Sequence, residues 1–342
     1  MTTSPLLDRR RTLRTLAGTF AAPAVAAFGG SLGGNSFAQG VPSKVRQAIA
    51  DFAKMEPRTC SALVRVDAPT GTWSAGHNAD ARLFVGSAVK TFILAEFLRQ
   101  AEAGTVAQNE PCEIDDRFRS LSSPVFGRLS GMSTYGHALD AMIAYSDNMA
   151  TDIALSKATP ERVRALIAQA GLKQTQIPTS TRRLFSYLAG GPLGVDLGWD
   201  AMRRLADNQD IGLKPRTDVI NANESMVSSA SDLVSWYQQV LAGKFFKNPS
   251  STREFKRISS MATALWLTVP KDVIAFGKGG SIDWEDFHAL CLAGQMRVRD
   301  VPVSFCFSLN WTGGPLDSNS RVPEYGAAVS RVLAQVHSVV RG

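Results

Sequence analysis

A serine and a lysine three residues apart, Ser87 and Lys90, stand in the stretch FVGSAVKTF. A serine hydroxyl becomes an effective nucleophile when a nearby base removes its proton, and a neutral lysine can be that base. The stretch SAVKTFILAEFLRQAEAG predicts a helix that ends at Gly104, with Ser87 in its first turn and Lys90 one turn later on the same face. A serine there can also be a plain helix cap, and Ser-x-x-Lys arises by chance about once in a chain of this size.

Two further triplets strengthen the catalytic interpretation. Residues 146–148, Ser-Asp-Asn, begin another helical pattern, and residues 278–280, Lys-Gly-Gly, end a strand pattern. The order Ser-x-x-Lys, Ser-Asp-Asn, Lys-[Thr/Gly]-Gly resembles the active-site serine penicillin-recognising enzymes, most of all the class A β-lactamases. The resemblance covers nearly all of the chain after its N-terminal segment. It implies a serine hydrolase that opens β-lactam rings through an acyl-enzyme on Ser87.

The resemblance also implies a role for each catalytic residue. Ser87 is the nucleophile, Lys90 is its base, and Ser146 passes a proton toward the leaving nitrogen. Asn148 holds Lys90 and the amide of the substrate. Asp147, by contrast, is expected to cap local backbone and to be structural.

Substrate binding is expected at the strand that carries Lys278, Gly280 and Ser281. Lys278 would attract the carboxylate of a β-lactam or of a peptide C-terminus. The backbone N–H groups of Ser87 and Ser281 would form the oxyanion hole.

Lys278 also makes Lys90 a credible base. Half-neutralising Lys90 at pH 7 takes a pKa drop of about 3.4 units, roughly 4.6 kcal/mol, and a like charge about 4 Å away supplies on the order of 4 kcal/mol.

Two features depart from the family pattern. Gly279 stands where the family has a threonine, and Ser281 is the candidate to replace its hydroxyl. The family also carries a glutamate, which activates the deacylating water, in the loop that corresponds to residues 173–195. Here that loop contains no Asp or Glu, so no residue is assigned as the deacylation base. The next acids along the chain are Asp196 and Asp200, and Glu224 is a candidate further on.

The order of elements predicts an α/β protein. Strand patterns lie at both ends of the chain, at residues 60–66, 72–77, 272–280, 287–296 and 301–311. Helical patterns flank them at residues 43–55 and 323–340. We therefore predict an α/β domain from residues 39–85 and 246–342, with an antiparallel sheet flanked by helices from both chain ends. An all-helical domain, residues 86–245, is inserted, and the active-site cleft lies between the two.

The first 38 residues predict an export signal. DRRRTLRTL is cationic, AGTFAAPAVAAF is a short apolar core, and SFA, ending at Ala38, offers small residues for cleavage. The paired arginines resemble a twin-arginine signal, and an ordinary Sec signal is the alternative. We expect a periplasmic or secreted protein. No cysteine precedes Cys60, so no stable lipid anchor is expected.

Export makes disulfides possible among four cysteines: Cys60, Cys112, Cys291 and Cys306. Folding the chain about residues 298–299 would place Cys291 opposite Cys306 on two paired strands. That arrangement suits a disulfide or two small buried side chains equally well. A bridge between Cys60 and Cys112 is likewise left open.

Charge and composition exclude several other functions. The formal charge is +7, of which +3 lies in the first 38 residues, so about +4 remains, and no nucleic-acid partner is needed to explain it. We expect a monomer without cofactor or metal, acting on a small β-lactam or a peptidoglycan peptide. The alternatives are a cell-wall D-Ala-D-Ala peptidase or esterase of the same superfamily and a non-catalytic penicillin-binding relative. The histidines lack zinc-site spacing: His77, His137, His288 and His337.

Overall fold

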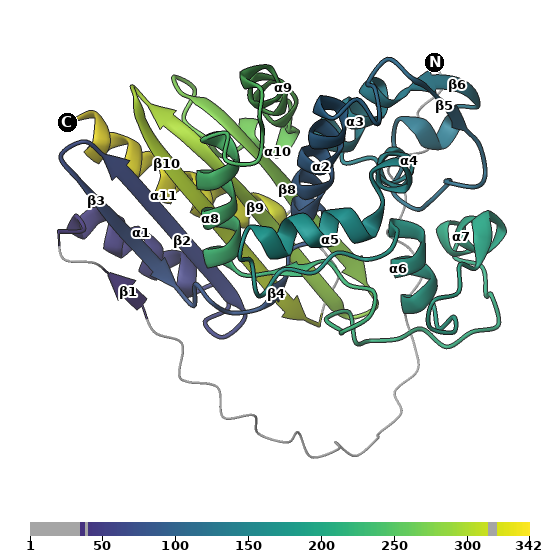
Figure 1. Cartoon of the computed structure of the whole chain (residues 1–342). Coiled ribbons are helices and arrows are strands. Elements are labelled where there is room, and N and C mark those ends of the chain that lie inside the picture. The colour runs from purple at the N-terminus through teal and green to yellow at the C-terminus, as the bar shows by residue number, and fades with distance from the viewer. Residues whose placement is uncertain (1–34, 38–39, 314–319) are drawn as a thin grey trace, which may run out of the picture. The chain divides into compact units, whose positions relative to one another are not determined.

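The computed structural model describes residues 35–37, 40–313 and 320–342, which belong to one compact unit. Its centre is a six-stranded antiparallel sheet with strand order β1-β3-β2-β10-β9-β8 (Figure 1). The α/β fold predicted from the sequence is confirmed. In sheet order the strands are β1 Asn35–Phe37, β3 Gly71–His77, β2 Cys60–Ala68, β10 Val301–Thr312, β9 Phe287–Val298 and β8 Ile274–Trp284.

Helices cover both faces of this sheet, which explains why β9 and β10 are buried on both sides. Helices α1 (Ser43–Ala53) and α11 (Arg321–Arg341) lie behind the sheet in Figure 1, and α8 (Ala230–Leu241) lies in front. On the rear face the ring of Phe52 meets that of Phe307 at 5.3 Å. The helix α8 lies within the predicted helical range 86–245 but packs on β2, β9 and β10.

The remaining helices gather mainly beyond the β8 side of the sheet (Figure 1). The central one is α2, which is buried almost all round; Phe92 on it packs against Trp236 of α8 at 4.7 Å. The described residues form one compact unit, so the division into two domains stays a prediction. The bounds are α2 Lys90–Glu102, α3 Tyr135–Ala144, α4 Asn148–Ala158, α5 Pro160–Gln169, α6 Thr181–Leu188, α7 Gly198–Ala206, α9 Pro249–Ser259 and α10 Thr263–Trp266.

Two short strand pairs complete the fold. β4 (Leu83–Phe84) pairs with β7 (Val227–Ser228), and β5 (Pro111–Ile114) pairs with β6 (Gly131–Thr134). The first pair matters for the site, because β4 immediately precedes the Ser87 turn.

The β9–β10 register corrects the predicted cysteine pairing. The turn is formed by residues 299–300, one residue later than predicted, so Cys291 pairs with Ser308 and Cys306 pairs with Ala293. The hydroxyl of Ser308 donates to the sulfur of Cys291 at 3.3 Å. All four cysteines, Cys60 and Cys112 included, are buried free thiols.

The predicted end of β8 at residue 280 was also wrong. The strand continues to Trp284, because its pairing with β9 persists as far as Trp284 and Phe287. The Lys-Gly-Gly triplet therefore lies in the middle of the strand, opposite the nucleophile turn, rather than at its end.

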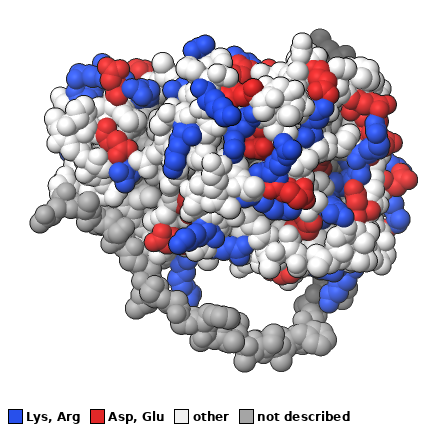
Figure 2. Space-filling model, viewed as in Figure 1, with Lys and Arg blue, Asp and Glu red and all other residues white. Residues whose placement is uncertain are grey.

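Most of the predicted export signal lies outside the described residues. Within it, residues 35–37 form β1 and pair with β3. No helix of the described chain is both long and apolar enough to cross a membrane. On the face shown in Figure 2, Lys and Arg are interspersed with Asp and Glu rather than gathered in a patch of one sign.

Candidate active site

Ser87 lies in a single 3-10 turn, Gly86–Val89, directly before α2. The backbone just before this turn, at Phe84 and Val85, makes hydrogen bonds on two sides. The amide of Asn310 accepts from the Phe84 N–H at 2.8 Å and donates to the Phe84 carbonyl at 2.9 Å. On the other side, the Val85 N–H donates to the Met226 carbonyl at 2.8 Å. Because Asn310 is almost fully buried, the backbone leading into Ser87 is fixed by the sheet itself.

The middle of β8 lies directly against this turn. A Cβ added to Gly280 would lie 2.0 Å from the Val85 carbonyl oxygen and 2.7 Å from the Ser87 nitrogen. Gly86 has φ +52°, and a Cβ there would lie 2.9 Å from the Ser281 nitrogen. Only glycines allow the two backbones to approach this closely. The two N–H groups proposed for the oxyanion hole, those of Ser87 and Ser281, thus come from neighbouring segments.

The Ser-Asp-Asn triplet is positioned by Asp147. Its carboxylate caps α4 by accepting from the Ala150 N–H, and it also accepts from the N–H groups of Val125 and Phe126, each at 2.8 Å. Ser146, just before it, has φ +60°, a left-handed conformation that is uncommon for serine. Asp147 therefore stabilises the turn that carries Ser146. It makes no hydrogen bond to either lysine.

The two lysines meet at the hydroxyl of Ser146. Lys90 Nζ donates to the Ser146 carbonyl at 2.7 Å, to Asn148 Oδ1 at 2.7 Å and to Ser146 Oγ at 3.3 Å. Lys278 Nζ donates to Ser146 Oγ at 2.9 Å and to the Gly279 carbonyl at 2.9 Å. Three segments far apart in the sequence are thereby joined at one oxygen atom. Asn148 is held in turn by the Leu121 carbonyl, to which its amide donates at 2.8 Å.

The electrostatics of this cluster favour neutral lysines. Burial lowers the pKa of Lys90 well below its usual value, and the charge of Lys278 lowers it further. Burial also lowers the pKa of Lys278 to about 7. A base near Ser87 that is uncharged at neutral pH is the requirement for removing the serine proton.

The structure brings together Lys90, Ser146, Asn148 and Lys278 by direct hydrogen bonds, and it places Ser87 beside them through the backbone. The Ser87 side chain is half-buried, and its hydroxyl has no hydrogen-bond partner among the described residues. It is thus open to an incoming group. Ser281 is exposed at the mouth of the site.

The missing threonine of the third motif has a structural reason. A Cβ added to Gly279 would lie 2.6 Å from the Cβ of Ala264 in α10. This distance is shorter than real side-chain contacts, so α10 occupies the space that a larger residue would need. A glycine fits at position 279 because a helix lies over the strand at this point.

The three acids considered for deacylation are engaged elsewhere. Asp196 accepts from the guanidinium of Arg182 at 2.7 and 2.8 Å, and the Asp200 side chain is 91% exposed on α7. Glu224 is buried and accepts from the Thr179 N–H at 2.7 Å.

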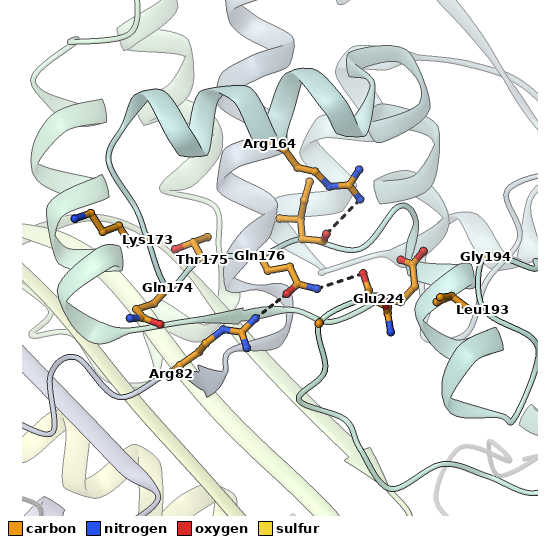
Figure 3. A pocket seen from close by; sticks show the side chains of 12 residues that line it. Arg82, Arg164, Lys173, Gln174, Thr175, Gln176, Leu193, Gly194 and Glu224 are labelled. Carbon is orange, nitrogen blue, oxygen red and sulfur yellow. Dashed lines mark hydrogen bonds between the residues drawn. The ribbon is translucent and has the colours of Figure 1, made fainter. Parts of the chain in front are cut away.

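Glu224 also belongs to a different cavity, of about 610 Å³, which Figure 3 shows from close by. That cavity is polar, with Arg82, Arg164 and Lys173 in its walls, and none of the catalytic candidates lines it. Glu224 thus faces a separate part of the surface. Asp196, Asp200 and Glu224 are all poorly placed to activate a water at Ser87.

Sequence reasoning missed a carboxylate that does lie near Lys90. Asp152, on α4, is buried, and burial raises its pKa to about 6. Its oxygens accept from the Thr181 N–H at 2.6 Å, the Thr181 hydroxyl at 2.8 Å and the Arg182 N–H at 3.1 Å. The signal was available: Asp152 follows Asn148 by four residues in a helix, which places both on one face.

Comparisons with known proteins identify the family and the fold of this chain. The family model described as "Beta-lactamase enzyme family" matches residues 44–291. No curated protein matches the chain by sequence.

Solved structures share the fold at low identity. A β-lactamase from Chitinophaga pinensis is 15% identical with a TM-score of 0.66, covering 86% of this chain and 99% of its own. The chromosome-encoded β-lactamase of Vibrio parahaemolyticus is 15% identical with a TM-score of 0.64, covering 87% and 99%. A protein called PBP-A is 15% identical with a TM-score of 0.63, covering 87% and 96%. The matched family model spans well over half of the sequence and includes all three motifs, and the chain therefore belongs to the β-lactamase enzyme family.

Proposed function

We propose that this protein is an exported hydrolase that opens β-lactam rings through a covalent acyl-enzyme on Ser87. One observation carries the proposal: a single hydroxyl, that of Ser146, joins two buried lysines beside the nucleophile turn. This arrangement supplies a base for the nucleophile and an acid for the leaving group within one hydrogen-bonded cluster.

The acylation step follows from the hydrogen bonds. Neutral Lys90 takes the proton of Ser87, and the serine oxygen attacks the carbonyl carbon of the ring. The Ser87 and Ser281 N–H groups stabilise the oxyanion. The two N–H groups of neutral Lys90 serve its shorter contacts, to the Ser146 carbonyl and to Asn148 Oδ1. Ser146 Oγ accepts from Lys278, so its own O–H is free to donate to the ring nitrogen as the C–N bond breaks. The lysines then return a proton to Ser146.

Deacylation is proposed to be slow. Residues 173–195 contain no carboxylate, and the buried Asp152 already accepts three hydrogen bonds from Thr181 and Arg182. General-base assistance typically contributes about 10²–10⁴ in rate. The acyl-enzyme should therefore accumulate after a burst of one product per enzyme.

The same missing carboxylate favours a second candidate, a cell-wall D-Ala-D-Ala peptidase or esterase. PBP-A has a similar fold, and a mutant of PBP-A has been solved as an acyl-enzyme complex with penicillin G. A peptidase would be acylated by a penicillin and trapped. A non-catalytic binding relative would not be acylated at all.

Intact-mass analysis with a penicillin over time tests these candidates. We expect one adduct per chain at Ser87, accumulating and then declining slowly, and no adduct with Ser87→Ala. An adduct that persists for hours supports the peptidase. Labelling that survives Ser87→Ala, or no labelling of the wild type, contradicts the proposed mechanism.

Export is tested separately by sequencing the N-terminus of the protein recovered from the periplasm or medium. Cleavage after Ala38 is the expected result. Replacing the paired arginines before Thr12, Arg10 and Arg11, by lysines distinguishes the two routes, because it should block twin-arginine export and spare Sec export. Recovery of the full chain only from the cytoplasm would contradict export.

A further inference from the structure

An apolar pocket of about 250 Å³ opens beside the catalytic cluster. Ser146 and Lys278 form part of its wall, so it is continuous with the groups that act on the leaving half of a substrate. It extends from there between β8, β9, α10 and the first turns of α11. Its walls include six hydrophobic side chains: Ala262, Ala264, Leu267, Leu290, Leu292 and Val322.

Three of the polar side chains in the wall already donate to backbone carbonyls. The Tyr325 hydroxyl donates to the Phe307 carbonyl at 2.8 Å, and the Thr263 hydroxyl donates to the Ala144 carbonyl at 3.1 Å. Thr268 likewise donates to the Ala264 carbonyl at 3.3 Å. Among the lining residues, Lys278 is the single charged side chain. Beyond Lys278 the pocket therefore offers an apolar surface with few free hydrogen-bonding groups.

The sequence keeps this space open. Gly279 and Gly326 line it without side chains, and a Cβ added to Gly326 would meet no atom within 4 Å.

We propose that this pocket binds an uncharged apolar substituent on the leaving-group half of the substrate. The assignment to that half rests on the proposed function, in which Ser146 protonates the leaving atom, and on the position of Ser146 in the pocket wall. The site thus prefers esters or amides whose leaving group carries an alkyl or aryl extension over those whose leaving group carries none.

The test uses 4-alkylphenyl acetates with methyl, propyl and hexyl substituents. In each, Ser87 Oγ attacks the acetyl carbon, the bond to the phenol oxygen breaks, and that oxygen takes the proton of Ser146. The phenols are similarly acidic, so differences in acylation rate report binding of the alkyl group. Acylation efficiency should rise by up to about fourfold for each buried methylene until the pocket is full. Lengthening the acyl chain instead should give no such rise.

Two variants, each with a control, locate the effect. Gly326→Leu, a favourable change in helix α11, should fill the pocket and abolish the rise of acylation efficiency with alkyl length. Ala327→Leu, at the exposed neighbouring position, should leave that rise unchanged. Leu267→Glu should also abolish the rise of acylation efficiency with alkyl length. Trp266→Glu should not, because Leu267 lines the pocket and Trp266 does not. Both side chains are more than 70% exposed, so neither change threatens folding.

The outcomes separate this inference from the proposed function. If penicillin labels Ser87 but acylation efficiency does not rise with alkyl length, the pocket assignment is wrong and the proposed function stands. If the efficiency rises with alkyl length and neither Gly326→Leu nor Leu267→Glu reduces that rise, the assignment is also wrong, because the alkyl group then binds elsewhere. If no reagent acylates Ser87, the proposed function fails and this inference fails with it.

Discussion

At the scale of single residues, the site is governed by charge around one buried ammonium group. The nitrogen of Lys90 bonds only to neutral acceptors, the oxygens of Ser146 and Asn148. Burial lowers its pKa most, and groups that do not touch it then adjust that pKa. The cation of Lys278 lowers this pKa, and the carboxylates of Asp147 and Asp152 raise it. Two substitutions should therefore move the same pH profile in opposite directions.

The first substitution is Lys278→Ala. Removing this cation raises the pKa of Lys90, so the neutral base is available only at higher pH. The acid limb of the acylation rate, followed by stopped flow with a chromogenic cephalosporin, should shift upward by about one unit or more. Lys173→Ala, on the separate polar cavity, is the control and should leave the limb in place. An unshifted limb for Lys278→Ala would mean that burial alone neutralises Lys90.

The second substitution is Asp152→Asn, which keeps the shape of the side chain and an acceptor for Thr181. Loss of the negative charge lowers the pKa of Lys90 further. The same acid limb should shift downward, by a few tenths of a unit to about one unit. A merely structural role for Asp152 would reduce the rate at every pH without moving the limb, and that result would contradict the electrostatic role.

At the scale of elements, the catalytic geometry depends on how closely β8 approaches the 3-10 turn that carries Ser87. The contact is made by backbone on both sides, since Gly280 faces Val85 and Gly86 faces Ser281. No side chain can adjust its rotamer to relieve a change there. A single added methyl group must move one of the two segments.

Gly280→Ala should therefore reduce the acylation rate by about 10²-fold while the protein still folds. Its Cβ would lie 2.0 Å from the Val85 carbonyl, and displacing catalytic groups by about 1 Å can reduce rates by about 10²-fold. Labelling of Ser87 by a fluorescent penicillin measures the effect, and cooperative thermal unfolding of the variant shows that the fold is retained. Wild-type labelling by a folded Gly280→Ala variant would show that the close approach is not needed.

Periodicity predicted most of these elements, because burial of one face imposes it locally. The helix ending near Gly104, the two flanking helices near the chain ends and the three C-terminal strands all follow such patterns. The cysteine register failed because a shift of the turn by one residue moves every cross-strand partner by two. Asn310 was not foreseen, since its contact with Phe84 joins residues 226 positions apart and no local pattern records it.

At the scale of the whole molecule, the buried lysines make stability depend on pH in an unusual direction. The pKa of Lys278 is about 7 in the folded protein, against an ordinary value of 10.5 that applies when the chain is unfolded. Between these values the unfolded chain binds a proton that the folded protein does not bind. The free energy of unfolding therefore rises with pH in this window.

Lys278→Met removes this contribution. The free energy of unfolding of the wild type relative to that of Lys278→Met should increase by about 1 kcal/mol for each pH unit between pH 7 and pH 9. Urea titrations at several pH values measure it. A surface replacement, Lys173→Met, should give a difference that is constant with pH. A constant difference for Lys278→Met as well would show that Lys278 keeps its ordinary pKa when folded.

The contact between Gly279 and Ala264 limits the mutational routes open to this chain. A threonine at position 279 would restore the usual third motif, but its Cβ would collide with the Ala264 Cβ at 2.6 Å. Ala264→Gly on α10 would relieve that collision first, at a cost of about 1 kcal/mol in helix propensity. The order of the two changes is therefore fixed. In a library selected for β-lactam hydrolysis, Gly279→Thr should be recovered together with a smaller residue at position 264 and should be lost when it arises alone.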